Sequence, residues 1–407
     1  MGNSLSVDGT AAVHMFTSSA AWIEGDATRQ LQEVAKLDGV TAVAAMPDLH
    51  PGKYGPVGCA VLAGLIHPGL IGADIGCGMG LFALDVAARR LRADKVADRL
   101  RALGGAWSGD ALARVEDMGL AASAYDGSLG TIGGGNHFCE LQVVDEIIDP
   151  EAAGRAGIDA EGAYLLVHSG SRGLGYAVLE GLLAGGLQSL DPASDAGHAY
   201  LAAHDHAVRW AVLNRRIIAE RAAGALRLDM QLVNDVGHNL AEVTGNGILH
   251  RKGAASANRG FVPVPGSRGA LSYLVEPVAH APEESLASLA HGAGRKYERG
   301  SMHGRVGAKK SDLARLQRNR FGGVVVCEDR NLLIEEAPEA YKAIGQVIED
   351  LTQFGLARVV ATFRPLVTFK SVKETLGAVD ASRQSRDKNR REKAEGRLRR
   401  KAREDWR

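Results

Sequence analysis

The sequence predicts an α+β fold. Stretches with helical spacing and strand-like apolar runs both occur, but they do not alternate regularly, which argues against a doubly wound α/β sheet. Glycine accounts for 51 of the 407 residues, well above the usual ~7%, so many tight turns and close backbone approaches are expected. Apolar content of 45% and charged content of 24% are typical of a globular protein.

The expected elements follow from apolar spacing and from turn residues. Helices are expected at about 26–37, across 86–125, at 196–223, where Gly224 follows, and at 282–290, where Pro282 opens the first turn. Strands are expected at 40–46, between glycine turns in 57–85, at 138–144 and 164–168, within 230–275, and at 357–370.

Charge separates the chain into two parts. The formal net charge is zero, but residues 371–407 contain 13 Lys and Arg against 7 Asp and Glu, which leaves the preceding 370 residues net acidic. We therefore expect one folded domain over 1–370 and a basic extension over 371–407 that is helical or disordered. Such an extension suits a polyanion, and a solvated charged helix is an equal alternative.

The cellular compartment is inferred from the cysteines and from the N-terminus. The four cysteines show no close pairing and no Cys-x-x-Cys motif, and the chain does not open on a signal-peptide pattern. The apolar run at 56–84 is broken by His67, Pro68, Asp74 and many glycines, which argues against a membrane span. A cytoplasmic protein with reduced thiols is expected.

A glycine-rich segment carries the clearest metal signal. Asp74 and Cys77 stand three residues apart among the glycines of 72–80, so the backbone can bring both side chains to one point. A carboxylate with a thiolate suits a divalent Mn, Fe, Co or Zn ion. The alternative is a buried structural cysteine beside a capping aspartate.

Three histidines, His137, His168 and His238, stand in similar settings. Each lies beside a strand or a glycine turn with polar neighbours that can orient the ring, although a lone buried histidine more often has a packing role. With Asp74 and Cys77 they make five candidate ligands. That number is one too many for a closed tetrahedral site and suits two metals that share the thiolate.

His291 is the candidate nucleophile. It stands in the segment His291-Gly292-Ala293-Gly294-Arg295, where bare glycines let backbone N–H groups approach an anion and the arginine supplies a permanent charge. An imidazole placed there can attack a phosphoryl group and hold it as a phosphoramidate. The alternative is a His-Gly turn without chemistry. The chain has no Walker A motif, and no Rossmann fingerprint follows a strand and opens a helix.

Taken in order, these motifs resemble those of the RtcB family of GTP-dependent RNA ligases. The resemblance covers nearly all of the chain before residue 371. It runs through 46–50, 74–79, 130–137, 168–173, 238–239, 251–254, 265–267, 291–295, 336–342 and the last strand to Lys370. It implies a single catalytic domain over 1–370, with mixed and antiparallel sheets flanked by helices around a dinuclear metal site.

The resemblance also implies a mechanism. His291 would attack the α-phosphate of GTP, release pyrophosphate and form a histidine–GMP phosphoramidate. The GMP would pass to an RNA 3′-phosphate, and a 5′-hydroxyl would then displace it; a 2′,3′-cyclic phosphate would first be opened. The expected role is RNA repair or tRNA splicing by a monomer, with GTP and RNA ends as partners and no membrane partner.

The same resemblance assigns ligands residue by residue. Asp74, Cys77 and His137 would hold one Mn²⁺, and Cys77, His168 and His238 would hold the other. The residues expected to contact the guanylate are Asn136, His137, Phe138, Cys139, Glu140, His238, Asn239, Pro265, Gly266, Ser267, Arg268, Ser272, His291, Gly292, Ala293, Gly294, Tyr341 and Lys370. Glu140 would accept hydrogen bonds from the guanine N1–H and N2 amino groups and so favour GTP over ATP.

Three features depart from the family pattern. Arg268 stands where an uncharged residue is expected, so it could add a phosphate contact or alter the grip on the nucleotide. The stretch between Gly80 and Gly130 is shorter than in many members, so the RNA-facing surface could differ, and the chain continues beyond Lys370, where it normally ends. These features are compatible with the RtcB paralogues associated with release factor H.

Two other functions stay open. One is a metal-dependent phosphohydrolase of cyclic phosphates, and the other is a non-catalytic RNA-binding protein. The complete set of candidate ligands disfavours the second.

Overall fold

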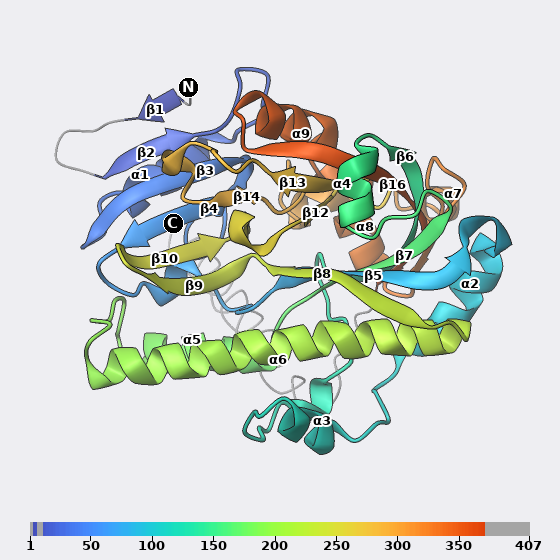
Figure 1. Ribbon diagram of the computed structural model, residues 1–407, viewed down its shortest axis with the longest axis horizontal. Coiled ribbons are helices and arrows are strands. Elements are labelled where there is room, and N and C mark those ends of the chain that lie inside the picture. The colour runs from blue at the N-terminus through green and yellow to red at the C-terminus, as the bar shows by residue number, and fades with distance from the viewer. Residues whose placement is uncertain (1–2, 6–10, 371–407) are drawn as a thin grey trace, which may run out of the picture.

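The computed structural model describes residues 3–5 and 11–370, and its elements confirm the α+β fold. Two sheets dominate the structure (Figure 1). The first sheet has the strand order β1 (Asn3–Leu5), β2 (Ala12–Met15), β3 (Val40–His50), β4 (Val57–Ala63), β10 (Gly247–Lys252) and β9 (Asn239–Thr244). Its neighbours pair antiparallel except β2 and β3, which are parallel.

The second sheet is built mainly from the middle and the end of the chain. Its order is β12 (Val262–Pro265), β13 (Ser272–Pro277), β16 (Ala357–Lys370), β6 (Phe138–Ile147), β7 (Gly162–Ser169), β5 (Gly78–Ala87) and β8 (Met230–Gly237), and β15 (Val324–Cys327) pairs with β16. β16 has the bounds expected from the sequence, and β6 and β7 contain the strands expected at 138–144 and 164–168.

Helices cover the sheets on several sides. They are α1 (Gly25–Val34), α2 (Ala93–Leu100), α3 (Ala111–Asp117), α4 (Pro150–Arg155), α5 (Gly173–Ala184), α6 (Asp195–Leu226), α7 (Lys310–Leu316), α8 (Arg330–Glu335) and α9 (Ile344–Gln353). The longest, α6, runs the width of the molecule in Figure 1 and contacts β5, β7 and β8. None of the helices in the described residues is both long and apolar enough to cross a membrane.

The prediction of a helix at 282–290 is wrong. The structure has a 3₁₀ turn at Glu283–Ser285, and then Leu286 and Ala287 adopt left-handed backbone angles with φ of 51° and 46°. The following residues form β14 (Ser288–Ala290), which pairs with β11 (Ala254–Ser256). A strand partner distant in sequence therefore overrides the local helical preference.

Two other helical predictions need smaller corrections. The long helix does not stop before Gly224; it continues to Leu226, which is buried, and ends where Arg227 adopts a left-handed φ of 60°. The region 86–125 is not one helical stretch, because only α2 and α3 form there, with 3₁₀ turns and glycine-containing loops beside them. The prediction for 371–407 lies outside the described residues.

Candidate functional site

Three strands bring Cys77, His168 and His238 together. In the register of β5 with its two neighbours, Gly78 pairs with Ser169 of β7 and with Gly237 of β8. Each candidate ligand is adjacent in sequence to one of these paired positions. Antiparallel pairing therefore places all three residues at the same end of these neighbouring strands. Their ligand atoms lie within 4.8 Å of one another there, and their side chains are buried.

A second group consists of Asp74, Cys77 and His137, whose ligand atoms also lie within 4.8 Å of one another. His137 Nε2 lies 2.8 Å from Asp74 Oδ2 and 3.3 Å from Cys77 Sγ. Cys77 belongs to both groups, because its Sγ also lies 3.2 Å from His168 Nε2. The structure thus gathers the five predicted ligands around one shared sulfur.

The chemistry of this cluster fits divalent cations. Burial raises the pKa of the Cys77 thiol well above its usual range, and the nearby Asp74 carboxylate raises it further. Burial lowers the pKa of His168 and His238 well below that of a free imidazole, which leaves neutral rings that can ligate. His238 Nδ1 is buried without a hydrogen-bond partner in the described part of the chain. A thiol, imidazoles and a carboxylate suit borderline metals, and a bound cation would favour the thiolate.

Arg215 on α6 holds the backbone beside two of the ligands. Its Nη1 donates to the carbonyl oxygens of Gly76, at 2.7 Å, and Ser169, at 2.8 Å. These residues are adjacent in sequence to Cys77 and His168, so one guanidinium fixes the distance between the two strand ends. The side chain is almost fully buried, which makes its hydrogen bonds costly to lose.

The neighbouring Asn214 and the partner of Arg215 extend this support. Asn214 Oδ1 accepts from the Gly130 N–H at 2.8 Å, and Nδ2 donates to Gly170 O at 3.3 Å. Arg215 Nε donates to Asp235 Oδ2 at 2.8 Å, and Asp235 lies on β8, three residues before His238. The long helix therefore contacts the segments that precede or follow each of the three buried candidate metal-ligand histidines.

His291 follows β14 at the start of the glycine turn. Its Nδ1 lies 2.7 Å from Asp48 Oδ2 on β3, and its backbone N–H donates to the same oxygen at 3.2 Å. The His291 and His238 ring centroids are 4.5 Å apart, so the candidate nucleophile adjoins the candidate metal-ligand cluster. Gly294 has a φ of 69°, and a Cβ there would collide with the carbonyl of Asp48. The turn therefore requires glycine at this position.

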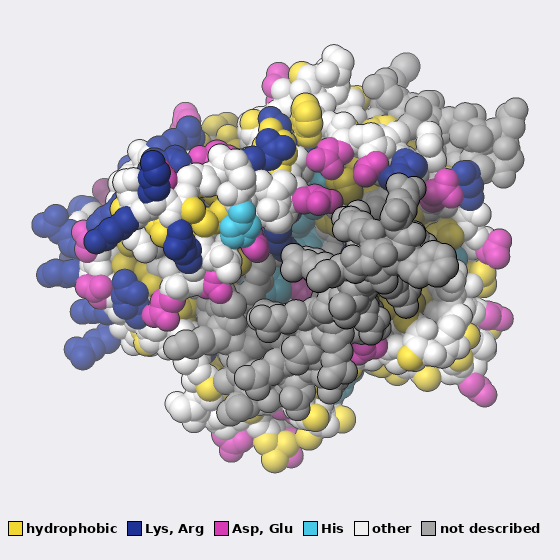
Figure 2. Space-filling view, turned by 180° about the vertical axis from the view of Figure 1, so that it is seen from behind, with side chains coloured by type: hydrophobic (Ala, Val, Ile, Leu, Met, Phe, Trp, Pro, Cys, Tyr) yellow, Lys and Arg dark blue, Asp and Glu magenta, His cyan; other side chains and the backbone are white. Residues whose placement is uncertain are grey.

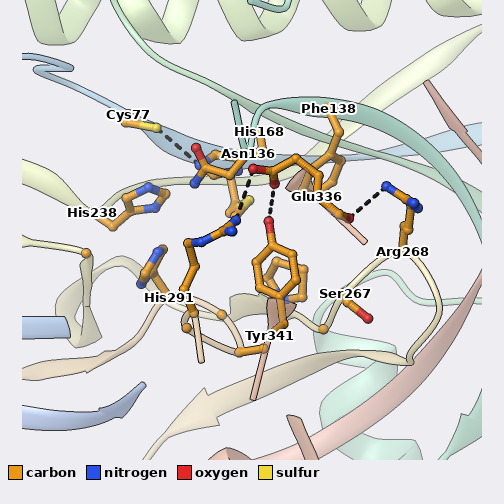
Figure 3. Close-up of a pocket in the computed structure, with 18 of the residues that line it drawn as sticks. Cys77, Asn136, Phe138, His168, His238, Ser267, Arg268, His291, Glu336 and Tyr341 are labelled. Atoms are coloured by element: carbon orange, nitrogen blue, oxygen red, sulfur yellow. Dashed lines mark hydrogen bonds and ion pairs between the residues drawn. The ribbon is translucent and has the colours of Figure 1, made fainter. Parts of the chain in front are cut away.

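A cavity of about 270 Å³ opens beside these groups, and Figure 3 shows His291 and His238 side by side within it, with Tyr341 and Glu336 across from them. The predicted site residues that line it are Asp74, Cys77, Asn136, Phe138, Glu140, His168, His238, Asn239, Pro265, Gly266, Ser267, Arg268, His291, Gly292, Ala293, Gly294, Tyr341 and Lys370. The fold therefore brings residues from distant parts of the chain to one cavity.

Two buried ionisable groups, Glu140 and Lys370, line this cavity. Glu140 Oε1 accepts from Gln142 Nε2 at 2.6 Å, and Oε2 accepts from the Thr368 hydroxyl. Lys370 Nζ donates to the His137 carbonyl at 3.0 Å. Burial raises the pKa of Glu140 and lowers the pKa of Lys370 to about 8. Both groups offer directed polar contacts to a ligand in a largely desolvated cavity.

Comparison with known proteins identifies the family. The family model described as tRNA-splicing ligase RtcB matches residues 30–116 and 103–371. The chain belongs to the RtcB family. The RNA-splicing ligase RtcB2 of Escherichia coli is 43% identical over 366 residues, which cover 88% of this chain and 96% of that protein. The RNA-splicing ligase RtcB of Mycobacterium bovis is 31% identical, covering 83% of this chain and 99% of its own. The tRNA-splicing ligase RtcB of Archaeoglobus fulgidus is 29% identical, covering 84% and 91% respectively.

Three residues expected at the guanylate of this RtcB-family chain, His137, Cys139 and Ser272, do not line the cavity. His137 instead belongs to the candidate metal-ligand cluster. Cys139 alternates with Phe138 and Glu140 along β6, so its side chain faces the opposite side of the sheet and packs in a hydrophobic core. Ser272 is also buried, and its hydroxyl accepts from Gln142 Nε2 at 2.8 Å. Ser272 therefore supports the side chain that holds Glu140.

Arg268 does not have the role expected from the sequence. Its Nη1 donates to Glu336 O at 2.7 Å (Figure 3), and its Nη2 donates to Leu333 O at 2.9 Å. Both carbonyls lie at the C-terminal end of α8. Carbonyl groups at a helix C-terminus attract cations, so Arg268 caps α8. It lines the cavity, but these two donors are already used within the protein.

Sequence reasoning gave no role to Asp48 or Glu336. Glu336 is buried, and its Oε1 accepts from Arg295 Nη1 at 3.0 Å and from Arg299 Nε at 3.1 Å, while the Tyr341 hydroxyl donates to Oε2. Glu336 therefore holds two arginines and the Tyr341 hydroxyl in place along one side of the cavity. Both Asp48 and Glu336 lie within motifs noted in the sequence, 46–50 and 336–342, and these motifs mark the segments without identifying the contacts of either carboxylate.

Proposed function

We propose that this RtcB-family RNA ligase joins an RNA 3′-phosphate, or a 2′,3′-cyclic phosphate, to a 5′-hydroxyl through GMP held on His291. The observation that supports it most directly is the arrangement of His291. The ring adjoins a five-residue metal-ligand cluster on one side, and a buried carboxylate backs it on the other. RNA repair or tRNA splicing is the role in which such ends need joining.

The first step follows from the contacts of His291. Asp48 beside Nδ1 favours the tautomer that carries its proton on that nitrogen, so the Nε2 lone pair is free to attack. Attack on the α-phosphorus of GTP forms a P–N bond and breaks the bond to the bridging oxygen, which leaves with pyrophosphate. Backbone N–H groups of the glycine turn are suited to the phosphate oxygens.

The later steps consume this intermediate. An oxygen of the RNA 3′-phosphate attacks the phosphorus of the bound GMP, which frees His291 and activates the RNA end. The 5′-hydroxyl of the second RNA then attacks the former 3′-phosphate, forms the new phosphodiester and releases GMP. A cyclic phosphate is first opened by water to the 3′-phosphate.

The metal assignment is part of the proposal. Asp74, Cys77 and His137 would hold one Mn²⁺, and Cys77, His168 and His238 would hold a second, with Cys77 shared. When bound, two cations supply charge neutralisation for the triphosphate and Lewis-acid activation of the reacting phosphate. The polypeptide orients these ligands through α6.

Glu140 is proposed to select guanine. Its carboxylate lines the cavity and is fixed by Gln142 and Thr368, so it can accept from the N1–H and N2 amino group of guanine. Adenine lacks this pair of donors. Asn136, Phe138, Asn239, Tyr341 and Lys370 complete the proposed guanylate site, and Glu140→Ala should lower the preference for GTP over ATP.

A labelling experiment tests the central step. The protein is incubated with α-³²P-GTP and Mn²⁺, and protein-bound label is tested for the acid lability of a phosphoramidate. Label on the wild type and none on His291→Ala is expected. Absence of label on the wild type, or equal label on both proteins, would refute the histidine–GMP step.

Ligation assays separate the alternatives. Opening of a cyclic phosphate without joined product would favour a phosphohydrolase, and RNA binding without either reaction would favour a non-catalytic protein. A monomer in the cytoplasm is also proposed, and sedimentation analysis and localisation of a tagged chain test those two statements.

A further inference from the structure

A second cavity, of about 440 Å³, lies next to the first and shares Arg268 as a lining residue. Three more arginines line it, namely Arg315, Arg318 and Arg320, and Glu339 supplies the one carboxylate among the described lining residues. Both Nη atoms of the buried Arg268 bind neutral carbonyls, so its guanidinium keeps its net positive charge beside the cavity. The lining is therefore strongly cationic.

This cavity belongs to a basic end of the molecule. Residues 305–320 contain six Lys and Arg against one Asp, and residues 88–101, around α2, contain six against two. The two segments meet where Arg318 Nη2 lies 2.8 Å from Asp94 Oδ1. Figure 2 shows Lys and Arg side chains gathered at the end of the molecule where Figure 1 places α2 and α7.

The rest of the described structure does not share this charge. Residues 1–370 contain 35 Lys and Arg against 41 Asp and Glu, so their net charge is negative although the α2–α7 end is positive. A field of this kind attracts a polyanion to one end of the protein and orients it there. The basic end adjoins the His291 cavity, because Arg268 lines both cavities. A polyanion bound at the basic end can therefore continue into the cavity that contains His291.

We propose that the cavity lined by Arg268, Arg315, Arg318 and Arg320 binds backbone phosphates of the RNA strand whose end reacts at His291. The inference rests on the proposed RNA ligase function and adds a binding surface to it. Arginine suits this role because its planar guanidinium forms paired hydrogen bonds with phosphate.

The exposure of these side chains supports a ligand role. The Arg315 and Arg318 side chains are 63% and 55% exposed, so their ion pairs with Glu339 and Asp94 are solvated and readily exchanged. The Arg320 guanidinium lies 4.7 Å from the centre of the Phe321 ring, and such an aromatic–arginine pair can stack on an unpaired base. Single-stranded RNA offers both phosphates and unpaired bases, which favours it over a simple anion.

The test uses the full chain and compares two charge reversals of equal size. Arg315→Glu with Arg320→Glu alters the basic cavity. The matched control, Arg29→Glu with Lys36→Glu, removes two exposed cations that pair with Asp26 and Glu33 at α1, near the other end of Figure 1. Binding of a fluorescent single-stranded RNA with a 3′-phosphate is measured by anisotropy across a salt series, without GTP.

The cavity variant should bind the RNA about tenfold more weakly at low salt. Loss of two phosphate contacts should also reduce the slope of log Kd against log salt by about 1.4. Label from α-³²P-GTP should stay at the wild-type level in both variants, which shows an intact His291 site. RNA affinity equal to wild type, or an equal loss in the control, would overturn the proposal. Because binding is measured without GTP, failure of the labelling experiment is a separate result that bears on the proposed function.

Discussion

Asp48 Oδ2 lies 2.7 Å from His291 Nδ1, although 243 residues separate the two in sequence. The carboxylate is fully buried on β3, and the same oxygen accepts the backbone N–H of His291. One oxygen thus accepts the backbone N–H of the candidate nucleophile and lies within ion-pair distance of its ring. The free ring nitrogen, Nε2, is the one that remains for chemistry.

Asp48→Asn should therefore lower the rate of guanylylation while leaving the fold intact. An amide can donate to Nδ1 and favour the tautomer that protonates Nε2, which removes the attacking lone pair. By analogy with the loss of an orienting aspartate in a catalytic triad, the rate should fall by about 10²-fold or more. Single-turnover labelling with α-³²P-GTP measures the rate, and the melting temperature checks the fold. A wild-type rate in a folded Asp48→Asn protein would contradict this role.

Gly294→Ala should destabilise the protein and impair labelling. The left-handed φ of 69° costs a non-glycine residue about 1–2 kcal/mol, and contact of the new Cβ with the Asp48 carbonyl adds to that cost. Gly304→Ala is the matched control, because a Cβ there meets no atom within 4 Å. Urea unfolding compares the two variants. Equal free energies of unfolding would show that the turn adapts to alanine.

Arg215 should determine how well the cluster around Cys77 binds a metal. Arg215→Gln removes the donor that spans Gly76 O and Ser169 O, so metal affinity should fall by about 10–100-fold, as for other residues that orient metal ligands. Arg216→Gln is the control, because that side chain is 63% exposed and pairs only with Glu220 among the described residues. The thiolate-to-Co²⁺ charge-transfer band gives the affinity without any activity assay.

A second variant distinguishes a positioning role of Arg215 from a general loss of folding. Asp235→Asn keeps the shape of the side chain but weakens the ion pair that holds Arg215. It should weaken Co²⁺ binding less than Arg215→Gln does. Wild-type Co²⁺ affinity in both folded variants would exclude a positioning role for Arg215.

The α+β class and the longest elements were predictable, because their apolar patterns extend over many residues. β16 was expected at 357–370 and forms there, and α6 differs from its expected bounds by a few residues. The stretch 282–290 was not predictable from local pattern. Its last three residues pair with β11, and this partner lies more than thirty positions earlier in the chain. Such pairing is a tertiary effect that overrides local propensity.

The candidate site also contains both predictable and unpredictable residues. The ligand cluster could be predicted from Asp74 and Cys77, because the glycines around them allow the backbone to bring the two side chains close together. Asp48 carried no such signal, since its importance comes from a contact with His291 across two strands. The sequence signal at Arg268 was misleading. Its charge suggested a phosphate contact, but its hydrogen bonds cap α8 instead.

Removal of residues 371–407 should weaken RNA binding and spare guanylylation. The segment carries 13 Lys and Arg against 7 Asp and Glu, so it can add phosphate contacts that are strongest at low salt. The deletion retains Lys370 and thus the proposed guanylate site. Anisotropy at two salt concentrations measures the loss. Equal RNA affinity with and without the segment would refute the prediction.

Binding of GMP should weaken as the pH rises through 8. Burial lowers the pKa of Lys370 from 10.5 to about 8, with Glu336 opposing this shift and Arg268 and Arg299 nearby. The ammonium group therefore loses its charge above pH 8, and a charge-assisted hydrogen bond to the nucleotide becomes an ordinary one, a loss of about tenfold in affinity by pH 9.5.

Lys370→Arg provides the matched comparison, because an arginine stays charged over this range. Its GMP affinity should fall less than that of the wild type between pH 7 and 9.5 in calorimetric titrations without metal, because ionisation of the guanine N1–H affects both proteins equally. The stability of the ligand-free wild type should change with pH in the opposite direction to its GMP affinity. Its unfolded chain binds more protons than the folded one between pH 8 and 10.5, so this lysine makes folding more favourable as the pH rises through that window. Parallel pH profiles of GMP binding in the two proteins would show that the charge of Lys370 does not contact the nucleotide.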